Sequence, residues 1–205
     1  MLGSRVTSSR LVAPENLRRV CEHVPPSKIF PSLRARFCEV VSAEFEVRPF
    51  HESDLDAIVE FSLRAWEPVF ESMHQVLGEA IFARLHHPDW RAVQAEAVRS
   101  SCTSEDRDAF VAAVDQRPVG FVTIALNAFH KCMGVVDMIA VDPAYQRLGI
   151  ARRLMDRSVA HMRERGMDIA AVGTGGDPGH APARAFYDAL GYTALPGVRY
   201  LKLLD

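Results

Sequence analysis

The residues best placed to do chemistry gather around Gly149, where a β-branched run passes through Asp142 and Pro143 into a helical pattern. Pro143 has no N–H to give to a strand ladder, so it marks the end of the strand. Gly149 lets the backbone come close to a ligand at the first turn of the following helix. The main-chain N–H groups from about Arg147 to Arg152 then lack helical acceptors and lie at the positive end of the helix dipole. This stretch therefore predicts an anion-binding cradle.

The charge of the following segment agrees with such a cradle. From Gln146 to Arg165 the sequence has six arginines and two acids, in a chain whose formal net charge is −2. An anionic partner is therefore expected to dock here. A solvated amphipathic helix with a glycine at its start would explain the same residues, and the residue pattern alone leaves that alternative open.

Other kinds of site have weaker support. The four cysteines are widely scattered and form no C-x-x-C pair, so we expect reduced structural thiols. The adjacent His86 and His87 lie in no H-E-x-x-H frame, and no metal site is expected. The stretch Gly173-Thr-Gly-Gly176 would suit a nucleotide phosphate, but no lysine follows it to complete a P-loop.

Length and composition set the broad class. A chain of 205 residues with 48% hydrophobic and 24% charged residues fits one globular domain with an appendage. No apolar run approaches the roughly 18 residues of a membrane helix, and arginines interrupt the start where a signal peptide would be apolar. We expect a cytoplasmic protein without a membrane partner. The slightly negative charge, and the lack of aromatic residues between the arginines, argue against nucleic-acid binding.

The elements that position the cradle begin after an arginine-rich extension, residues 1–44, which four prolines divide into short pieces. Within it, residues 16–24 and 32–41 could each form a turn or two of helix, and the extension could be an ordered strap, a dimer arm or a disordered segment. A homodimer is left open. The domain, residues 45–205, begins with an alternating strand at 45–50. Ser53 or Asp54 should then cap a helix to about Trp66, and Pro68 should end or kink it. Two further amphipathic helices are predicted at 69–85 and 90–100.

Strands dominate the second half of the chain. A hairpin of 109–114 and 119–126 leads into the central strand, so three antiparallel strands precede the cradle. The arginine-rich helix ends at Gly166, and the buried strand 168–172 should pair in parallel with the central strand by a right-handed crossover. A helix beginning at Pro182 and closed by Gly191 precedes a last hairpin, 192–195 and 198–203, over Pro196 and Gly197. The predicted fold is α+β, with one mixed sheet of six or seven strands and helices on both faces.

Three stretches resemble the GCN5-related N-acetyltransferase superfamily. Gln146-Arg-Leu-Gly-Ile-Ala151 is similar to the Q/R-x-x-G-x-G/A loop of that superfamily, and Ile139 to Tyr145 resembles the strand and turn that precede it. Ala183 to Tyr192 resembles its last helix and turn. The resemblance covers roughly residues 133–192.

The resemblance implies acetyl-coenzyme A (acetyl-CoA) as co-substrate. In the family the loop binds the pyrophosphate, and the central strand hydrogen-bonds the pantetheine arm and the acetyl oxygen through its backbone. The positions that match are Ile139, Ala140, Val141, Gln146, Arg147, Leu148, Gly149, Ile150, Ala151, Arg152, His180 and Arg184. His180 stands where many members have an asparagine, which puts that contact in doubt.

Acetyl transfer to an amine needs a polarised thioester carbonyl, a neutral amine and a proton for the departing thiolate. Tyr187 lies four residues before Gly191, where the resemblance implies a tyrosine that protonates the sulfur; a core tyrosine beside Phe186 is the alternative. Asp137 is the candidate base, and alternation along the strand places it on the same face as Ile139. A strand aspartate without a role is equally open, and His74, His130 and His180 lack a supporting frame.

The resemblance implies an N-acetyltransferase acting on a primary amine of a small molecule, with a peptide or protein amine as a variant. The protein-N-terminus variant is disfavoured because Val172-Gly173-Thr174 stands where such enzymes often carry a glutamate. Substrate choice is expected to depend on about 64–90, whose lining candidates are Trp66, Phe70, Met73, His74 and Phe82. The alternatives are a non-catalytic acyl-CoA sensor on the same fold and, last, a nucleotide-phosphate binder.

Overall fold

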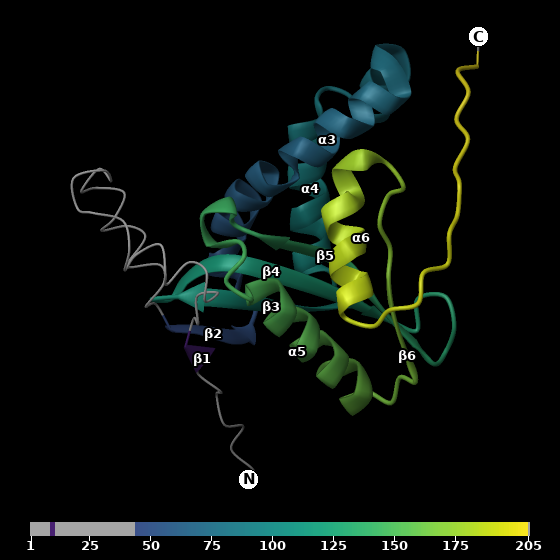
Figure 1. The fold of residues 1–205 in the computed structure, drawn as a ribbon. Coiled ribbons are helices and arrows are strands. Elements are labelled where there is room, and N and C mark those ends of the chain that lie inside the picture. The colour runs from purple at the N-terminus through teal and green to yellow at the C-terminus, as the bar shows by residue number, and fades with distance from the viewer. Residues whose placement is uncertain (1–8, 11–43, 205) are drawn as a thin grey trace, which may run out of the picture.

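The computed structural model describes residues 9–10 and 44–204 (Figure 1). Most of the extension 1–44, including its two predicted helical turns, lies outside the described residues. In chain order, the strands are β1 Ser9–Arg10, β2 Glu44–Pro49, β3 Arg107–Val114, β4 Arg117–Leu126, β5 Met133–Val141 and β6 Ile169–Val172. The α-helices are α3 Leu55–Leu85, α4 Trp90–Thr103, α5 Ile150–Glu164 and α6 Ala181–Ala189. Short 3-10 turns are η2 Glu52–Asp54, η3 Pro143–Tyr145 and η4 Pro178–His180.

One mixed sheet organises the described chain, with its strands in the order β1-β2-β3-β4-β5-β6. Strands β2 to β5 run antiparallel to their neighbours, and β6 runs parallel to β5 after the α5 crossover. Asp115 and Gln116 have φ of 47° and 65°, as the tight turn of the β3–β4 hairpin requires. The predicted α+β class, the hairpin and the parallel crossover are confirmed.

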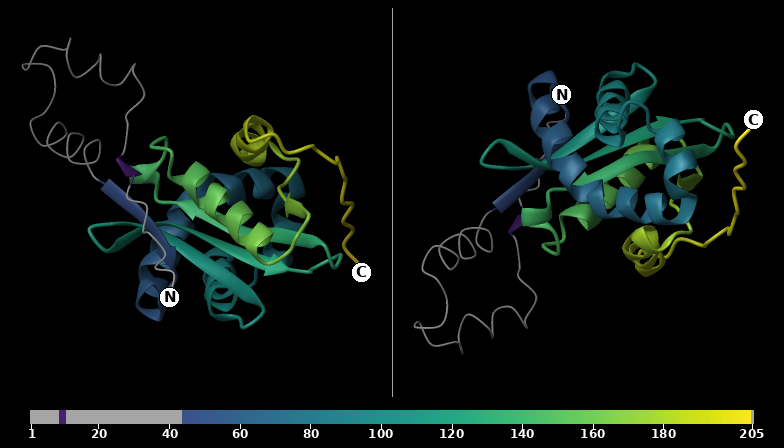
Figure 2. Two further views of the ribbon diagram at one scale, coloured as in Figure 1. Left: turned by 90° about the horizontal axis from the view of Figure 1, so that it is seen from below. Right: turned by 90° about the horizontal axis from the view of Figure 1, so that it is seen from above.

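Helices cover both faces of the sheet, as predicted, and each face has its own core (Figure 2). On one face, α3 and α4 bury a cluster that includes Ile58, Phe61 and Phe121. On the other, α5 packs through Leu154 and Met162 onto the sheet, and α6 packs beside it. Burial of apolar area on both sides of one sheet is the main stabilising term of such a layered fold.

The first helix differs from prediction. Asp54 does not cap it with its side chain; instead its carboxylate accepts hydrogen bonds from the His51 N–H and from Arg48. Helical structure continues through Pro68 to Leu85, and the break falls at Gly78, whose φ of 72° and ψ of 161° are non-helical. Glycine adopts that conformation without steric cost, whereas the chain on both sides of Pro68 is held by the buried rings of Phe61 and Phe70.

The predicted last hairpin is wrong. After α6 and Gly191, which has φ of 82°, residues 192–204 form no strand. A type II turn at Pro196 and Gly197 would fold the segment back, but it requires a positive φ at the glycine. Gly197 does not have a positive φ, so this turn does not form. The six strands of the sheet therefore include the short β1 at one edge and no strand beyond β6 at the other.

Within the described residues, none of the helices combines the length and apolar character needed to span a membrane. In the same residues, no group of three or more potential metal-ligating side chains is found. Cys102 is buried, which raises the pKa of its thiol to about 12, and Cys132 is half-buried and free. Cys21 and Cys38 lie in the part that is not described.

Candidate active site

The turn that joins β5 to α5 is built on Asp142. Its buried carboxylate accepts a hydrogen bond from the Ala144 N–H (3.0 Å) and one from Arg64 Nη2 of α3 (3.1 Å). The Gln146 side chain donates to the Val141 carbonyl oxygen at 3.2 Å and closes the turn against the end of the strand. The loop is therefore held from both sides before it reaches the helix.

Gly149 is the N-cap of α5 and has φ of 83°, while Arg147 has φ of 64°. Gly149 brings no capping side chain, and the first core contact of the helix is made by the buried Ile150. A Cβ built on Gly149 would meet no heavy atom within 4 Å. The space beside the uncapped N–H groups is open, so this loop fits an anion bound by backbone N–H groups, as the sequence predicts.

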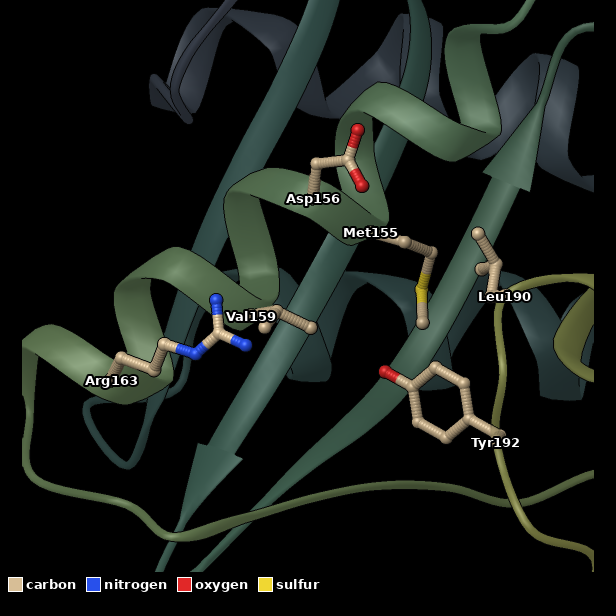
Figure 3. A pocket seen from close by; sticks show the side chains of 6 residues that line it. All are labelled: Met155, Asp156, Val159, Arg163, Leu190 and Tyr192. Carbon is tan, nitrogen blue, oxygen red and sulfur yellow. The ribbon is translucent and has the colours of Figure 1, made fainter.

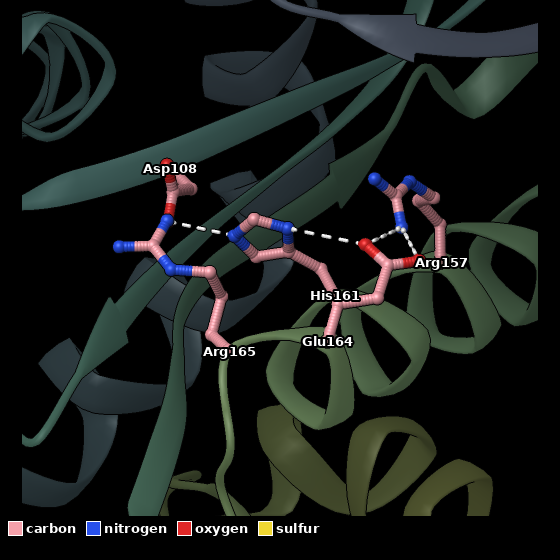
Figure 4. A network of polar contacts seen from close by, with 5 residues as sticks. All are labelled: Asp108, Arg157, His161, Glu164 and Arg165. Carbon is pink, nitrogen blue, oxygen red and sulfur yellow. Dashed lines mark hydrogen bonds and ion pairs between the residues drawn. The ribbon is translucent and has the colours of Figure 1, made fainter. Parts of the chain in front are cut away.

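The arginines of α5 divide into two groups. Arg147 and Arg152 are exposed in and beside the loop. Two later ones hold the helix against the sheet. Arg157 lies over the ring of Phe110 and pairs with Glu164 (3.3 Å). Arg165 pairs with Asp108 of β3 (3.4 Å; Figure 4). His161 Nε2 lies 2.7 Å from the Asp108 carboxylate in the same network. Only the arginines at the start of the helix are placed to meet an anion at the loop.

At the site, β5 continues beyond the end of β6. β5 pairs with β6 only from Met133–Ile169 to Val136–Val172, although β5 continues to Val141. On its other side β5 remains paired with β4 up to Val141. From Asp137 onwards, backbone groups of β5 on the β6 side therefore have no strand partner among the described residues and can hydrogen-bond a ligand. This segment contains Ile139, Ala140 and Val141.

A β-bulge lies directly after the last pair between β5 and β6. Thr123 pairs with Met138 and Ile124 with Val136, so Asp137 is the extra residue. Because of the bulge, Asp137 and Met138 both lie on the α3/α4 face, and Ile139 returns to the α5 face. The prediction that Asp137 and Ile139 share a face is wrong, since strict alternation fails at a bulge.

A polar chain fixes the bulge. The Met138 N–H donates to Thr123 Oγ1 (3.1 Å), Thr123 and Ser101 hydroxyls lie 2.8 Å apart, and Ser101 Oγ donates to Asp137 Oδ2 (2.8 Å). Since Ser101 gives its one proton to Asp137, Thr123 must donate to Ser101. Arg107 Nε also donates to Oδ2 (2.9 Å), and the described bonds leave Oδ1 open.

Three residues of this polar chain were not predicted from the sequence: Ser101, Thr123 and Arg107. Thr123 gave a signal, because it is the one polar side chain in the apolar run Val119–Leu126, and a fully buried hydroxyl needs a partner.

Tyr187 projects from α6 into the α5-side core beside Phe186 and Tyr192. Burial, with a smaller contribution from Tyr192, raises the pKa of the Tyr187 phenol to about 12. The phenol therefore keeps its proton throughout the range in which amines become neutral. Tyr187 and Asp137 lie on opposite faces of the sheet.

His180 and Arg184 belong to the segment that precedes and starts α6. The imidazole Nδ1 of His180 bonds the Asp177 carboxylate, whose other oxygen accepts from Ser72 of α3 at 2.8 Å. Burial opposes ionisation of Asp177, but the hydrogen bonds from Ser72 and His180 outweigh it and lower its pKa. Arg184 donates to the carbonyl oxygens of Gly175 and Asp177 and so braces the segment. Asp177 is therefore the partner that orients the His180 ring, and the sequence did not reveal this partner.

A cavity of about 290 Å³ lies between α5 and the end of α6 (Figure 3). None of the predicted site residues lines it. The hydroxyl of Tyr192 is buried and has no hydrogen-bond partner among the described residues. The lining residues are Met155, Asp156, Val159, Arg163, Leu190 and Tyr192.

Comparison with known proteins agrees with this geometry. The family model described as "Acetyltransferase (GNAT) family" matches residues 70–192, which is more than half of the chain. The chain therefore belongs to the GNAT family of acetyltransferases, and the predicted family is confirmed.

Two curated relatives are mycothiol acetyltransferases. The one from Thermomonospora curvata is 27% identical over 151 residues, covering 71% of this chain and 50% of the relative. The one from Propionibacterium freudenreichii is 29% identical over 103 residues, covering 48% of this chain and 33% of the relative. The chain thus spans half or less of the length of these relatives.

Solved structures share the fold. The aminoglycoside N-acetyltransferase AAC(6')-Iy in complex with CoA has a TM-score of 0.56 at 14% identity, covering 79% of this chain and 96% of that structure. The BH1408 protein from Bacillus halodurans has a TM-score of 0.59 at 14% identity, covering 77% and 99%. At this identity the likeness establishes the fold.

Proposed function

We propose that this chain transfers an acetyl group from acetyl-CoA to the primary amine of a small molecule by direct attack of the amine on the thioester. The observation that carries the proposal is the stretch of β5 that continues beyond the end of β6, together with Asp137 on one face of the sheet and Tyr187 on the other. The amine adds to the carbonyl carbon from above the plane of the thioester, whereas the sulfur leaves from a position within that plane. A group that serves the amine and a group that serves the sulfur can therefore come from different elements.

The chain's own groups suit a bound acetyl-CoA, which would supply the activated acetyl group. Uncapped N–H groups at Gly149 and the exposed Arg147 and Arg152 would hold the pyrophosphate. Unpaired backbone groups of Ile139 to Val141 would hold the pantetheine arm and polarise the acetyl carbonyl. Hydrogen bonds from a preorganised strand cost no rearrangement when charge develops on the oxygen.

Asp137 would receive the amine. Ser101 and Arg107 both bond Oδ2, so Oδ1 remains to accept a hydrogen bond from the amine and orient it. His180 is the second candidate for the base, because Asp177 fixes its Nδ1 and leaves Nε2 for a proton. Tyr187 would donate its proton to the thiolate as the C–S bond breaks.

The acceptor class is supported by the relatives, whose names specify mycothiol and aminoglycosides. Several predicted lining residues of α3 serve the fold instead: Phe70 is buried and stacks on Trp90 at 4.3 Å, and Trp66 packs on Phe121. His74 bonds Glu79 at 2.7 Å on the exposed side. A peptide or protein amine remains the variant, to be distinguished by assay.

We further propose that residues 45–205 form the acetyltransferase domain and that residues 1–44 are a separate extension. The start of β2 at Glu44 and the family match from residue 70 support this division.

The test is an assay of acetyl-CoA against a panel of amino sugars, polyamines, amino acids and short peptides, with detection of free coenzyme A thiol. We expect thiol release with at least one amino-sugar amine and acetylated product by mass spectrometry. Binding of acetyl-CoA without transfer to any amine would favour the sensor alternative. Failure of acetyl-CoA to bind would contradict the proposal as a whole.

A further inference from the structure

Helix α3 contacts two separate loops of the site, η3 after β5 and η4 after β6. Strands β5 and β6 are parallel, so the segments that follow them, 142–149 and 173–180, leave the same end of the pair. Ligands of parallel strands bind outside the carboxyl ends, between the segments that leave them. The positions of these two segments therefore decide how well a cofactor fits between them.

Arg64 makes the first contact. Its Nη2 donates to Oδ2 of Asp142 at 3.1 Å, and the other carboxylate oxygen, Oδ1, accepts from the Ala144 N–H at 3.0 Å. The two oxygens of one buried carboxylate thus join α3 to the turn that leads to Gly149. A buried carboxylate that loses its charged partner is destabilised, so the position of the turn depends on Arg64.

Ser72 makes the second contact, about two turns further along α3. Its hydroxyl donates to Asp177 Oδ2 at 2.8 Å and accepts from the Gly179 N–H at 2.9 Å. The approach is close, because a Cβ on Gly179 would lie 2.6 Å from the Ser72 Cβ and 3.0 Å from the Pro68 carbonyl oxygen. Only glycine fits between the segment and the helix at this distance.

Few other contacts hold the segment 173–180 in place. Its described backbone hydrogen bonds are local, such as the one from the His180 N–H to the Asp177 carbonyl oxygen (3.2 Å). Arg184 of the adjacent α6 bonds carbonyl oxygens within the same segment. Among the hydrogen bonds of the described residues, those at Ser72 alone join this segment to a distant element. Helix α3 therefore sets where His180 lies.

We propose that Arg64 and Ser72 are positioning residues for the cofactor, because through them α3 holds the two segments at the spacing that CoA requires. Each acts through the aspartate that it bonds, Asp142 or Asp177. This role rests on the cofactor site proposed above and adds to it a helix that lies outside that site. Since residues 64–90 are also the stretch expected to govern acceptor choice, α3 links the cofactor site to the acceptor site.

Calorimetric titration with CoA tests the two residues. Ser72→Ala and Arg64→Met should each weaken CoA binding by at least about fivefold, and Arg64→Lys should recover part of the loss because an ammonium group can still donate to Asp142. Ser62→Ala and Glu60→Gln are the matched controls. The Ser62 hydroxyl bonds a carbonyl oxygen of its own helix, and Glu60 is the other, exposed partner of Arg64. Both should keep CoA affinity within about twofold of wild type.

Hydrogen–deuterium exchange separates a positioning role from a general effect on the fold. In the free protein, Ser72→Ala should speed exchange in 173–180 and leave 142–149 unchanged, and Arg64→Met should do the reverse. Exchange that rises throughout the chain in both variants would show general destabilisation and would count against the proposal.

The titration also separates failure of this role from failure of the proposed function. Wild-type CoA affinity in either folded variant, or an equal loss in the controls, would overturn the role of α3 while the proposed function stands. A wild type that binds no CoA would overturn the proposed function together with this role.

Discussion

At the scale of residues, Tyr187 is the proposed acid, and its role belongs to the transition state. Tyr187→Phe should lower kcat and kcat/KM together by about 10²–10⁴-fold and leave acetyl-CoA affinity nearly unchanged. Steady-state kinetics with the acceptor found in the panel measures this. A folded Phe variant with wild-type kcat would assign the proton to water or to another residue.

The same substitution has a spectroscopic signature. The pKa of Tyr187 is raised to about 12, so its phenolate absorbance near 295 nm should develop about two pH units later than that of a free tyrosine. One late-titrating phenol should disappear in Tyr187→Phe. Because the folded pKa lies above the unfolded one, the folded state holds the proton longer, and the contribution of this group to stability is lost as pH rises from about 10 to 12.

Asp137 and His180 compete for the base. If Asp137 receives the amine, Asp137→Asn should lower kcat at least tenfold while His180→Gln mainly raises KM for one substrate. If the His180–Asp177 pair is the base, the acidic limb of the kcat/KM pH profile should vanish in His180→Gln and persist in Asp137→Asn. Retention of the full profile and rate in both variants would exclude both residues.

At the scale of elements, the bulge in β5 depends on Thr123. Thr123→Val keeps the shape but leaves the Met138 N–H without its acceptor and removes the hydrogen bond that the Ser101 oxygen accepts. Ser101 still donates to Asp137. Unfolding in urea should show a loss of about 2 kcal/mol, in the range of 1–3 kcal/mol for an unsatisfied buried group. Thr103→Val is the control, because the Thr103 hydroxyl bonds the Arg99 carbonyl oxygen on an exposed helix end. Equal losses at both positions would contradict the role of Thr123 in the bulge.

One glycine at each end of α5 allows a test variant and a matched control. Gly149 and Gly166 have φ of 83° and 79°, and a Cβ at either position meets nothing within 4 Å. A glutamate at each should cause a similar backbone strain of about 1–2 kcal/mol. Only Gly149→Glu should also abolish the rise in melting temperature that acetyl-CoA produces, because its charge occupies the anion cradle. A Gly149→Glu protein that acetyl-CoA still stabilises would disprove the cradle.

At the scale of the whole molecule, Arg48 and Asp54 join β2 to the start of α3 through two short hydrogen bonds, of 2.7 and 2.8 Å. Burial opposes ionisation of Asp54, but the bonds from Arg48 and the His51 N–H outweigh it and lower its pKa. Asp54→Asn should therefore destabilise the fold by about 1–3 kcal/mol at neutral pH.

The sign of the pH dependence follows from the lowered pKa. The contribution of Asp54 is present above the ordinary value of 3.8 and is lost as pH falls through the lower folded value. The difference between wild type and Asp54→Asn, measured by chemical denaturation, should shrink in that acidic range. Asp56→Asn is the control, because the Asp56–Arg99 pair is exposed and should contribute little at any pH. A difference that stays constant with pH would contradict the ion pair.

Local patterns in the sequence determined much of this protein. The change from strand to helix periodicity around Gly149, the hairpin, the parallel crossover and the family followed from residues that lie near one another in the chain. Gly149 was predicted to allow a close backbone approach and Gly191 to close a helix, and both have positive φ, a local conformation that glycine adopts without steric cost.

Tertiary structure decided the rest. The bulge at Asp137 needs Thr123 on the neighbouring strand and Ser101 on α4, so no periodicity within β5 could predict it. The frame of His180 includes Ser72, which is 105 residues from Asp177 in the chain. The last hairpin was predicted from its residue types, but residues 192–204 form no strand, because strand formation also depends on where the fold carries a segment relative to the sheet. Contacts between distant segments set these features, because hydrogen bonds and packing across a sheet act between residues that local sequence does not relate.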